Sequence, residues 1–475
     1  MARTQLVRLA LFALVALAAS SAAWLLLRRD RPLPPQEAKR AARQHSDKTP
    51  AAAMAGPPMF PRGALYGDHV MGLNEAIGVP IESMGGLRAP VWERNTLRRR
   101  GEATRALGVG LVRASSHVWP YLNHQQSQQR DGDLAEVDRL FQVLGEHDLD
   151  VVMVIGPWPG ARTAAFTKHY LPDDLDAYGA WVRNVVERYD GDGIDDMPGL
   201  TARVVAWEVD NEPDLHNSEP PRGVEPNDVV EGFEPPQEYA AVLLATADAI
   251  RKADPGATVL SGGIYRPMTP AGRDYLARVL EHPGALEAID GISLHCYFSE
   301  NNLGRVRDSM ASVRELAPDK AIWITETSVP SEARHPWVNP DWQARMVAGI
   351  YGAFLAEGAD RVFWHSLTTP PARSQGQPRG FGSNALLAST QDDGWVPKPA
   401  ALVYRRLAEH LSGVDMESVH EVPATGGRLL ATDQGWLAFW GEPQAPAEAR
   451  TVHDLMTDEQ GPIKGPVTAP AWLEP

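Results

Sequence analysis

Short runs of β-branched and other apolar residues recur along most of this chain, and each is followed by a segment with helical spacing. There are eight such runs. Strands as apolar as these are covered on both faces, which is typical of parallel sheets. A fold that alternates strand and helix is therefore the main expectation. The predicted strands are Ala64–Leu73, Gly110–Ala114, Asp150–Ile155, Arg203–Val209, Ala257–Ser261, Gly291–Leu294, Ala321–Thr325 and Ala359–His365.

The segments between these runs read as amphipathic helices. The clearest are Asp174–Tyr189, Pro236–Lys252 and Asp341–Glu357, whose apolar residues recur at helical spacing. Repeated strand–helix units within residues 62–413 predict a (β/α)8 barrel with enlarged loops. The alternative is an open, doubly wound sheet. It is disfavoured because no Gly-rich nucleotide-binding turn follows the first strand.

The beginning of the chain has a different composition. Leu9–Leu27 contains no charged residue. As a helix it would be roughly 28 Å long, close to the hydrocarbon thickness of a bilayer. Residues 1–30 are therefore predicted to be a transmembrane anchor or, alternatively, a secretory signal peptide. Residues 31–61 read as a flexible tether. Either alternative places the rest of the chain outside the cytoplasm, membrane-anchored or secreted.

The charge balance limits the possible partners. The chain has 45 Lys and Arg residues and 61 Asp and Glu residues, a net charge of −16. A body this acidic repels phosphate backbones, so nucleic acid is a poor candidate partner. Cys296 is the only cysteine, which excludes an internal disulfide and a Cys-based zinc site. The histidines form no metal-binding motif, so neither a catalytic metal nor another cofactor is expected. The oligomeric state is not indicated.

Two glutamates stand at the ends of predicted strands, where barrel enzymes carry their catalytic residues. Glu212 lies in Asn211-Glu212-Pro213 after the fourth strand, and Glu326 closes the seventh. These strands lie three apart around an eight-stranded barrel, so their ends face each other across its mouth. Two carboxylates about 5 Å apart are the nucleophile and acid/base of a retaining glycosidase. Taken alone, Glu326 could equally be a solvated strand-end carboxylate.

Asn211-Glu212-Pro213 after one strand, with a lone Glu326 three strands later, resembles glycoside hydrolase clan A, the retaining barrel glycosidases. The resemblance covers roughly residues 63–413. It implies that Glu212 is the acid/base, that Glu326 is the nucleophile and that Asn211 bonds the sugar 2-hydroxyl. Four further positions match the clan's pattern: Arg113, which keeps the nucleophile ionised; His295 and Tyr297, a His-x-Tyr pair whose tyrosine bonds the nucleophile; and Trp364, the aromatic floor of a sugar subsite.

Within the clan, the chain is most similar to family 39, with family 5 second. The third strand is followed by Gly156-Pro157-Trp158 and lacks the histidine of family 5. The context Ala206–Leu215 (AWEVDNEPDL) resembles family 39 more. Asp210 nevertheless stands where family 39 usually has an aromatic residue, and Thr327 stands where it often has one. Trp158 is a further candidate substrate-binding residue, because aromatic faces stack on sugar rings.

Residues 414–475 are predicted to form a small β-rich appendage. Leu429–Trp440 reads as a hairpin, and Val467–Leu473 reads as a last strand. A unit this small has little independent stability, so it is expected to pack on the barrel.

These features predict an exported retaining glycoside hydrolase that acts on an oligo- or polysaccharide. One alternative is a catalytically silent glycan-binding barrel, which would not need both glutamates together with Arg113 and Tyr297. Another is a transglycosylase that remodels surface polysaccharide with the same residues. Carbohydrate is the expected partner. The membrane is a second one if the N-terminal segment is not cleaved.

Overall fold

The computed structural model describes residues 70–74, 94–114, 119–122, 124–128, 132–157, 171–214, 235–265, 267, 269–297, 303–332, 337–368, 381–389 and 394–475. The expected membrane segment Leu9–Leu27, the expected tether and Trp158 lie outside these ranges. Within them, no helix combines the length and the apolar character needed to cross a bilayer. The predictions for the N-terminal segment therefore stay predictions.

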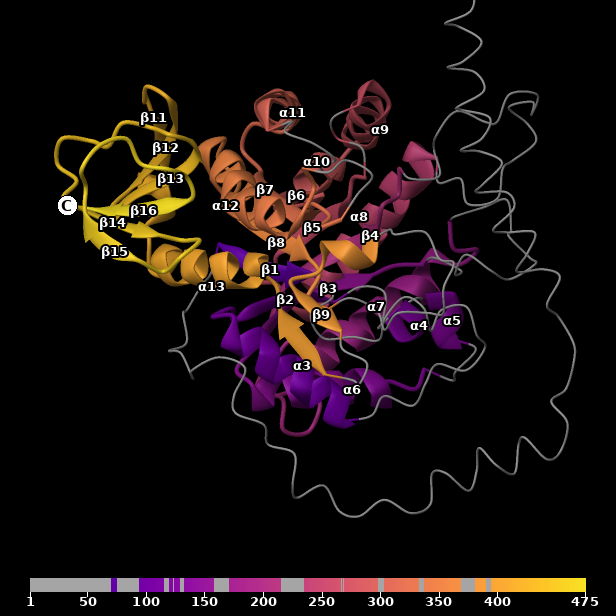
Figure 1. Cartoon of the computed structure of the whole chain (residues 1–475). Helices are drawn as coiled ribbons and strands as arrows, with labels where there is room; N and C mark the ends of the chain where they lie inside the picture. Colours follow the sequence, from indigo (N-terminus) through magenta and orange to yellow (C-terminus); the bar gives the residue numbers. More distant parts are fainter. Residues whose placement is uncertain are drawn as a thin grey trace, which may run out of the picture. The chain divides into compact units, whose positions relative to one another are not determined.

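Eight parallel strands close into a barrel in which β8 pairs with β1 (Figure 1). The predicted (β/α)8 fold is confirmed, and the open doubly wound sheet is wrong because β1 and β8 are not free edges. Strands β4 to β7 each continue two or three residues beyond their predicted ends. The strands are β1 Met71–Asn74, β2 Leu111–Ala114, β3 Asp150–Ile155, β4 Val204–Asn211, β5 Val259–Gly263, β6 Gly291–Tyr297, β7 Ala321–Ser328 and β8 Arg361–His365.

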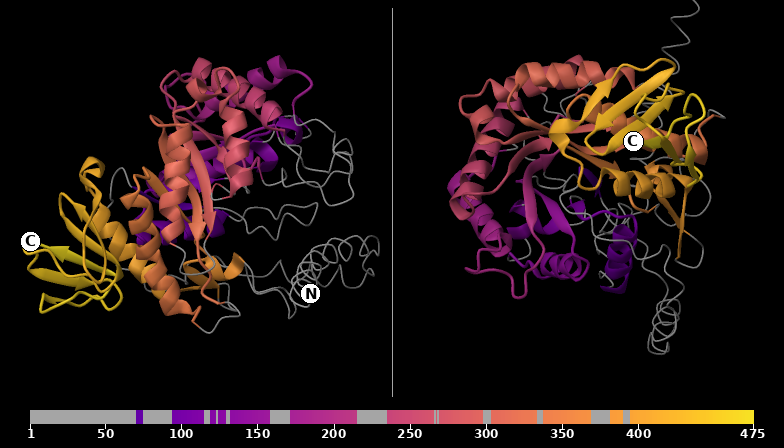
Figure 2. Two further views of the ribbon diagram at one scale, coloured as in Figure 1. Left: turned by 90° about the horizontal axis from the view of Figure 1, so that it is seen from above. Right: turned by 90° about the vertical axis from the view of Figure 1, so that its left-hand side faces the viewer.

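Helices alternate with the strands and surround the barrel (Figure 2). Asp174, Thr269 and Asn339 each accept a hydrogen bond from the backbone N–H three residues further on, which caps α7, α9 and α12. Four helices have proline in the first turn, where its missing N–H costs nothing. The helices are α3 Arg94–Ala106, α4 Trp119–Leu122, α5 His124–Gln128, α6 Ala135–Glu146, α7 Leu175–Tyr189, α8 Pro236–Ala253, α9 Pro270–Leu280, α10 Ala285–Ala288, α11 Gly304–Leu316, α12 Pro340–Ala356 and α13 Pro399–Leu411.

The barrel has an apolar filling that is distinct from the shell between strands and helices. The filling takes one buried side chain from each of six strands. The larger cluster joins the outer faces of the strands to the helices. Side chains alternate between the two faces of a strand. The six inward-pointing residues therefore fix which residues further along each strand also point into the barrel. The members of the filling are Leu111, Val152, Ala206, Leu260, Trp323 and Phe363.

The last part of the chain forms a six-stranded antiparallel sheet in the order β11-β12-β13-β16-β14-β15. Strands β12 and β13 make the predicted hairpin, which closes at Thr432 and Gly435. The last strand begins at Ala471, later than the predicted Val467. The strands of this sheet are β11 His420–Val422, β12 Gly427–Thr432, β13 Gly435–Gly441, β14 Thr451–Asp454, β15 Gln460–Pro462 and β16 Ala471–Glu474. Two further strands, β9 Leu387–Ser389 and β10 Trp395–Pro397, form a separate pair. The segments η2 Phe381–Asn384 and η3 Met416–Ser418 are short 3-10 helices.

The C-terminal sheet packs on α12 and α13. Gly352 of α12 lies so close to Phe439 of β13 that a Cβ at this position would overlap the phenylalanine ring. Phe439 is also part of the main apolar core. Arg406 of α13 donates from Nη1 to the carbonyl oxygen of Leu455 at 2.6 Å. The sheet thus shares its core with the barrel, as its small size requires.

Replacing Gly352 with Ala is expected to lower the free energy of unfolding by about 1–3 kcal/mol, because the added methyl group overpacks the contact with Phe439. Gly304→Ala in α11 is the matched control, since nothing lies within 4 Å of a Cβ there. It should be neutral or slightly stabilising because Ala favours helix. Urea unfolding of both variants measures the difference. Equal effects would contradict a close contact at Gly352.

Candidate active site

The mouth of the barrel is the end where the carboxyl ends of the strands meet. At the end of β4, Asp210 and Glu212 have φ angles of 70° and 55°. Residues with side chains enter this left-handed region at a cost, and such strain clusters at functional sites. The left-handed conformations of these two residues interrupt the alternation of inward- and outward-pointing side chains along the strand. As a result Asn211 and Glu212 both face groups of the mouth, where they contact Arg113 and His295.

A bulge reshapes the end of β7. The pairing of β6 with β7 shifts register at Thr325, and such a bulge re-aims side chains locally. Thr325 and Glu326 are consecutive, yet both face the barrel interior. The Thr325 hydroxyl contacts the Ser293 hydroxyl, and Glu326 Oε1 lies 2.9 Å from Arg113 Nη1.

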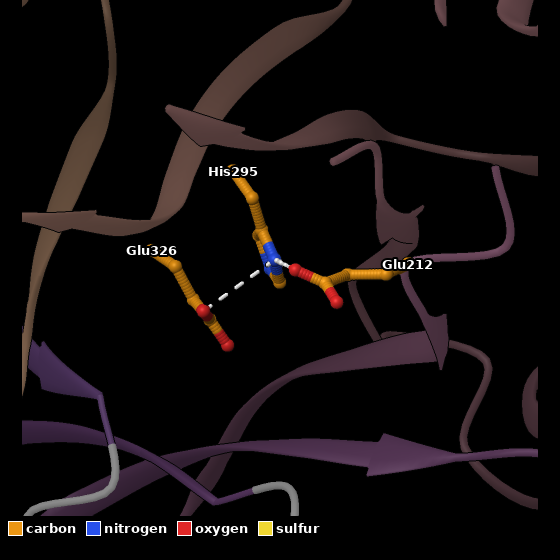
Figure 3. A group of neighbouring side chains, drawn as sticks. All are labelled: Glu212, His295 and Glu326. Carbon is orange, nitrogen blue, oxygen red and sulfur yellow. Dashed lines mark hydrogen bonds and ion pairs between the residues drawn. The ribbon is translucent and has the colours of Figure 1, made fainter. Parts of the chain in front are cut away.

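Glu212, His295 and Glu326 meet in the mouth (Figure 3). The Nδ1 atom of His295 lies 2.8 Å from Glu212 Oε1 and 3.6 Å from Glu326 Oε2. One oxygen of each carboxylate and a ring nitrogen of His295 all lie within 4.8 Å of one another. The structure thus brings together the two glutamates that the strand ends predict.

Glu326 is held as an ionised carboxylate. Burial by itself would raise its pKa, but neighbouring positive groups outweigh burial and lower the pKa to about 2. Its Oε2 accepts a hydrogen bond from the Tyr297 hydroxyl. Burial and the nearby carboxylates raise the pKa of Tyr297, so this hydroxyl keeps its proton. The groups that lower this pKa electrostatically, the largest contributor first, are His295, His365 and Arg113.

His295 lies between the two carboxylates and is fully buried. In the part of the chain that the structure describes, its Nε2 has no hydrogen-bond partner. This side of the ring packs on Gly263, where a Cβ would overlap the imidazole. A proton on Nδ1 therefore points toward Glu212 and Glu326. Burial alone would lower the pKa of His295, but the two carboxylates outweigh it and raise the pKa.

Arg113 organises the floor of the mouth through a glutamate that the sequence analysis did not assign. Glu208 is fully buried and accepts from Arg113 Nε at 2.6 Å and Nη2 at 3.0 Å. Ser293 Oγ donates to the same carboxylate at 2.9 Å. The remaining N–H groups of Arg113 reach Asn211 Oδ1 at 2.8 Å and Glu326 Oε1 at 2.9 Å. One guanidinium thus holds both of these residues.

Trp364 does not face the mouth, contrary to its expected place as the floor of a sugar subsite. It is fully buried in the outer core and donates from Nε1 to the carbonyl oxygen of Asn384 at 2.9 Å. The reason is strand alternation: Phe363 points into the barrel filling, so Trp364 points outward and His365 inward. The half-buried His365 packs edge-on against Tyr297, with ring centroids 6.1 Å apart.

Two other expectations concern the end of β3. Trp158 lies outside the described residues, so its role stays a prediction. Gly156, close to where family 5 has its histidine, makes room for the carboxylate of Asp210, because a Cβ at Gly156 would lie 3.0 Å from Asp210 Oδ2. Asp210 is buried there. Gly156, at the strand end that lacks the family 5 histidine, and Asp210, which replaces the usual aromatic residue of family 39, are therefore in contact.

Two groups of side chains have a spacing that suits a metal ion. One is the trio of Figure 3. There the guanidinium of Arg113, 2.9 Å from Glu326, adds a positive charge that opposes a cation. The other lies between α7 and β4, on the far side of the barrel from the mouth. The prediction that no catalytic metal takes part stays a prediction. The members of the second group are Asp190, Asp192 and Asp196.

Solved structures of several glycoside hydrolases have a similar fold. A family 39 glycoside hydrolase from the gut symbiont Bacteroides cellulosilyticus WH2 is 16% identical, with a TM-score of 0.54 over 85% of this chain and 78% of that one. AbfB, a family 51 α-L-arabinofuranosidase from Bifidobacterium longum, is 13% identical, with a TM-score of 0.52 over 87% and 96%. A family 39 β-xylosidase from Caulobacter crescentus is 16% identical, with a TM-score of 0.50 over 87% and 98%.

At these identities the likeness establishes the fold alone. The resemblance to the barrel glycosidases of clan A, with family 39 first, is confirmed at that level. No protein-family model and no curated protein matches the chain in sequence.

Replacing Glu208 with Gln is expected to lower the free energy of unfolding by about 3 kcal/mol, because it leaves a buried guanidinium without its bidentate partner. Glu146→Gln is the matched control. That carboxylate also pairs bidentately with an arginine, Arg98, at 2.5 and 2.7 Å, but in an exposed position. Loss of the exposed pair should leave stability nearly unchanged. Chemical denaturation compares the two variants, and equal costs would contradict the importance assigned to Glu208.

Proposed function

We propose that this chain is a retaining glycoside hydrolase with Glu326 as nucleophile and Glu212 as acid/base. The observation that carries the proposal is the approach of the two carboxylates, one oxygen of each lying within 4.8 Å of the other. Retaining enzymes separate these groups by about 5–5.5 Å, whereas inverting enzymes need about 6.5–9.5 Å to admit a water molecule. The environments also differ, because Glu326 is bound by Arg113 and Tyr297, whereas the contact of Glu212 is with His295. Different environments assign different roles to two carboxylates.

In the first half-reaction, a carboxylate oxygen of Glu326 bonds to the anomeric carbon as the bond to the leaving oxygen breaks. Glu212 transfers its proton to that oxygen, so the leaving group departs as an alcohol. Arg113 holds Oε1 of Glu326, and Tyr297 holds Oε2. With both oxygens held, the carboxylate keeps a single orientation toward the sugar.

In the second half-reaction, Glu212 takes a proton from water as the water oxygen attacks the anomeric carbon and the bond to Glu326 breaks. The negative charge is then on Glu212 before attack and returns to Glu326 afterwards. His295 Nδ1 lies 2.8 Å from one carboxylate and 3.6 Å from the other. It can therefore stabilise the charge in either position without moving far.

Asn211 and the buried ion pair support an enzyme over a silent glycan-binding barrel. Asn211 is partly buried in the mouth, and Arg113 fixes its side-chain oxygen. The amide N–H group can then donate to a sugar hydroxyl, as the clan resemblance implies. A barrel that only binds glycans has no use for a buried arginine shared between Glu208 and Glu326, since burying these charges is costly.

The proposed substrate is an oligo- or polysaccharide outside the cytoplasm. The support is the acidic body, which disfavours polyanionic nucleic acid, and the apolar segment Leu9–Leu27, which predicts export. Whether the segment is retained as an anchor or removed decides between a membrane-bound and a secreted enzyme.

Replacing each of the two glutamates in a separate variant tests their separate roles. Glu326→Gln is expected to abolish turnover with every leaving group, because no glycosyl-enzyme forms without the nucleophile. Glu212→Ala should lose about 10²–10⁴-fold on substrates whose leaving group needs protonation, and little on activated aryl glycosides. Added azide should restore turnover of the Glu212 variant, because azide replaces the water that needs a base. Steady-state kinetics on an aryl glycoside series measure both variants.

A fluorinated mechanism-based glycoside should label Glu326 and no other residue, as mass spectrometry of peptides would show. Azide rescue of the Glu326 variant in place of the Glu212 variant would mean that the two roles are exchanged. Unchanged turnover in both variants would refute the proposed function.

The proposed location has its own test. Protease added to intact cells is expected to remove the catalytic domain of an anchored enzyme, whereas a secreted enzyme appears in the medium. An internal cytoplasmic protein of the same cells is the control for lysis. Protection in intact cells, with digestion only after permeabilisation, would contradict an extracytoplasmic location.

A further inference from the structure

The groups of the mouth divide into those that a substrate can touch and those that it cannot. Arg113, Glu208 and His295 are fully buried and act from beneath the surface. Beside the nucleophile, the half-buried side chains are the ones with surface left for a ligand. Among the described residues at the ends of β4, β6 and β8, these are Asn211, Glu212, Tyr297, His365 and Ser366, whose hydroxyl donates to the carbonyl oxygen of Thr368 at 3.4 Å. The first three already have a place in the proposed reaction.

The direction of His365 follows from the barrel filling. Phe363 of β8 packs inside the barrel, where its ring stacks on Trp323 with centroids 6.3 Å apart. Residues two apart along a strand share a face. His365 therefore points inward one layer nearer the mouth.

Its neighbours place His365 in the subsite of the sugar that Glu326 attacks. The imidazole lies edge-on to Tyr297, at 6.1 Å between centroids and 82° between planes. The Tyr297 hydroxyl is bonded to Glu326. His365 also acts electrostatically on the carboxylate of Glu326, whose pKa it helps to lower. Through Tyr297, the end of β8 borders the space in which a sugar attacked by Glu326 would lie.

We infer that His365 is a substrate-binding residue that hydrogen-bonds a hydroxyl group of the sugar attacked by Glu326. The inference rests on the proposed function and specifies this subsite. An imidazole offers an N–H donor in both its neutral and its charged form, whereas an aromatic hydrocarbon ring offers only its face. The subsite therefore favours a sugar that directs a hydroxyl toward the end of β8.

The test compares His365→Phe, which keeps a ring and removes both polar nitrogens, with His365→Gln, which keeps a donor and an acceptor. The probes are the 2,4-dinitrophenyl β-glycosides of glucose, galactose, mannose and xylose; kcat/KM is measured with the one that the wild type cleaves fastest. The Phe variant should lose about tenfold in kcat/KM, the effect of one hydrogen bond. The Gln variant should recover most of this loss, which a merely space-filling role would not produce.

Two controls separate binding from folding. Trp364→Phe changes the adjacent outward residue and should lower Tm while leaving kcat/KM unchanged, because Trp364 is in the core. His420→Phe, at an exposed position of the C-terminal sheet, should change neither. Thermal melting of both His365 variants checks that each is folded in the assay.

The outcomes are distinct. Equal kcat/KM for wild type and His365→Phe, or equal losses in the Phe and Gln variants, would overturn the inference and leave the proposed function standing. A loss in Trp364→Phe with none in His365→Phe would overturn it as well, in favour of the outward residue. A Glu326→Gln variant that cleaves the chosen probe at the wild-type rate would overturn the proposed function and this inference together.

Discussion

The bidentate ion pair between Arg113 and Glu208 is the interaction on which the mouth of the barrel depends. Both side chains are fully buried, so each loses its hydration. The loss is offset because Glu208 also accepts from Ser293, while Arg113 distributes its remaining N–H groups between Asn211 and Glu326. Arg113 is on β2, and its partners are on β4 and β7. The planar guanidinium therefore transmits the rigid geometry of the closed sheet to the groups that would touch a sugar.

Irregular backbone at two strand ends completes this arrangement. A regular β4 and a regular β7 would each turn alternate residues away from the mouth. The left-handed conformations of Asp210 and Glu212 and the bulge at Thr325 let consecutive residues face the same way. These features cost conformational free energy, which the surrounding barrel supplies. The result places two carboxylates beside the same ring nitrogen, Nδ1 of His295, whose ring leaves no space for a Cβ at Gly263.

Much of this site could be predicted from residue types at strand ends. Glu212 and Glu326 stood out because a carboxylate after an apolar strand has no purpose in the core. Glu208 did not stand out, since it sits within the strand and its partner Arg113 is distant in sequence. A buried glutamate and a buried arginine become a pair only when the sheet closes. A possible signal was that each is a charged residue inside an otherwise apolar strand.

The order of residue types along the chain was sufficient to specify the closed barrel and the pair of glutamates at its mouth, because strand–helix alternation and the residues at strand ends are local properties. The direction of each side chain was not local. Trp364 and His365 are neighbours, and either could have faced the mouth of the barrel. Packing of Phe363 against Trp323 inside the barrel settled the choice, since a side chain on one face of a strand places the next on the other. That contact joins two strands, and it exists only in the folded protein.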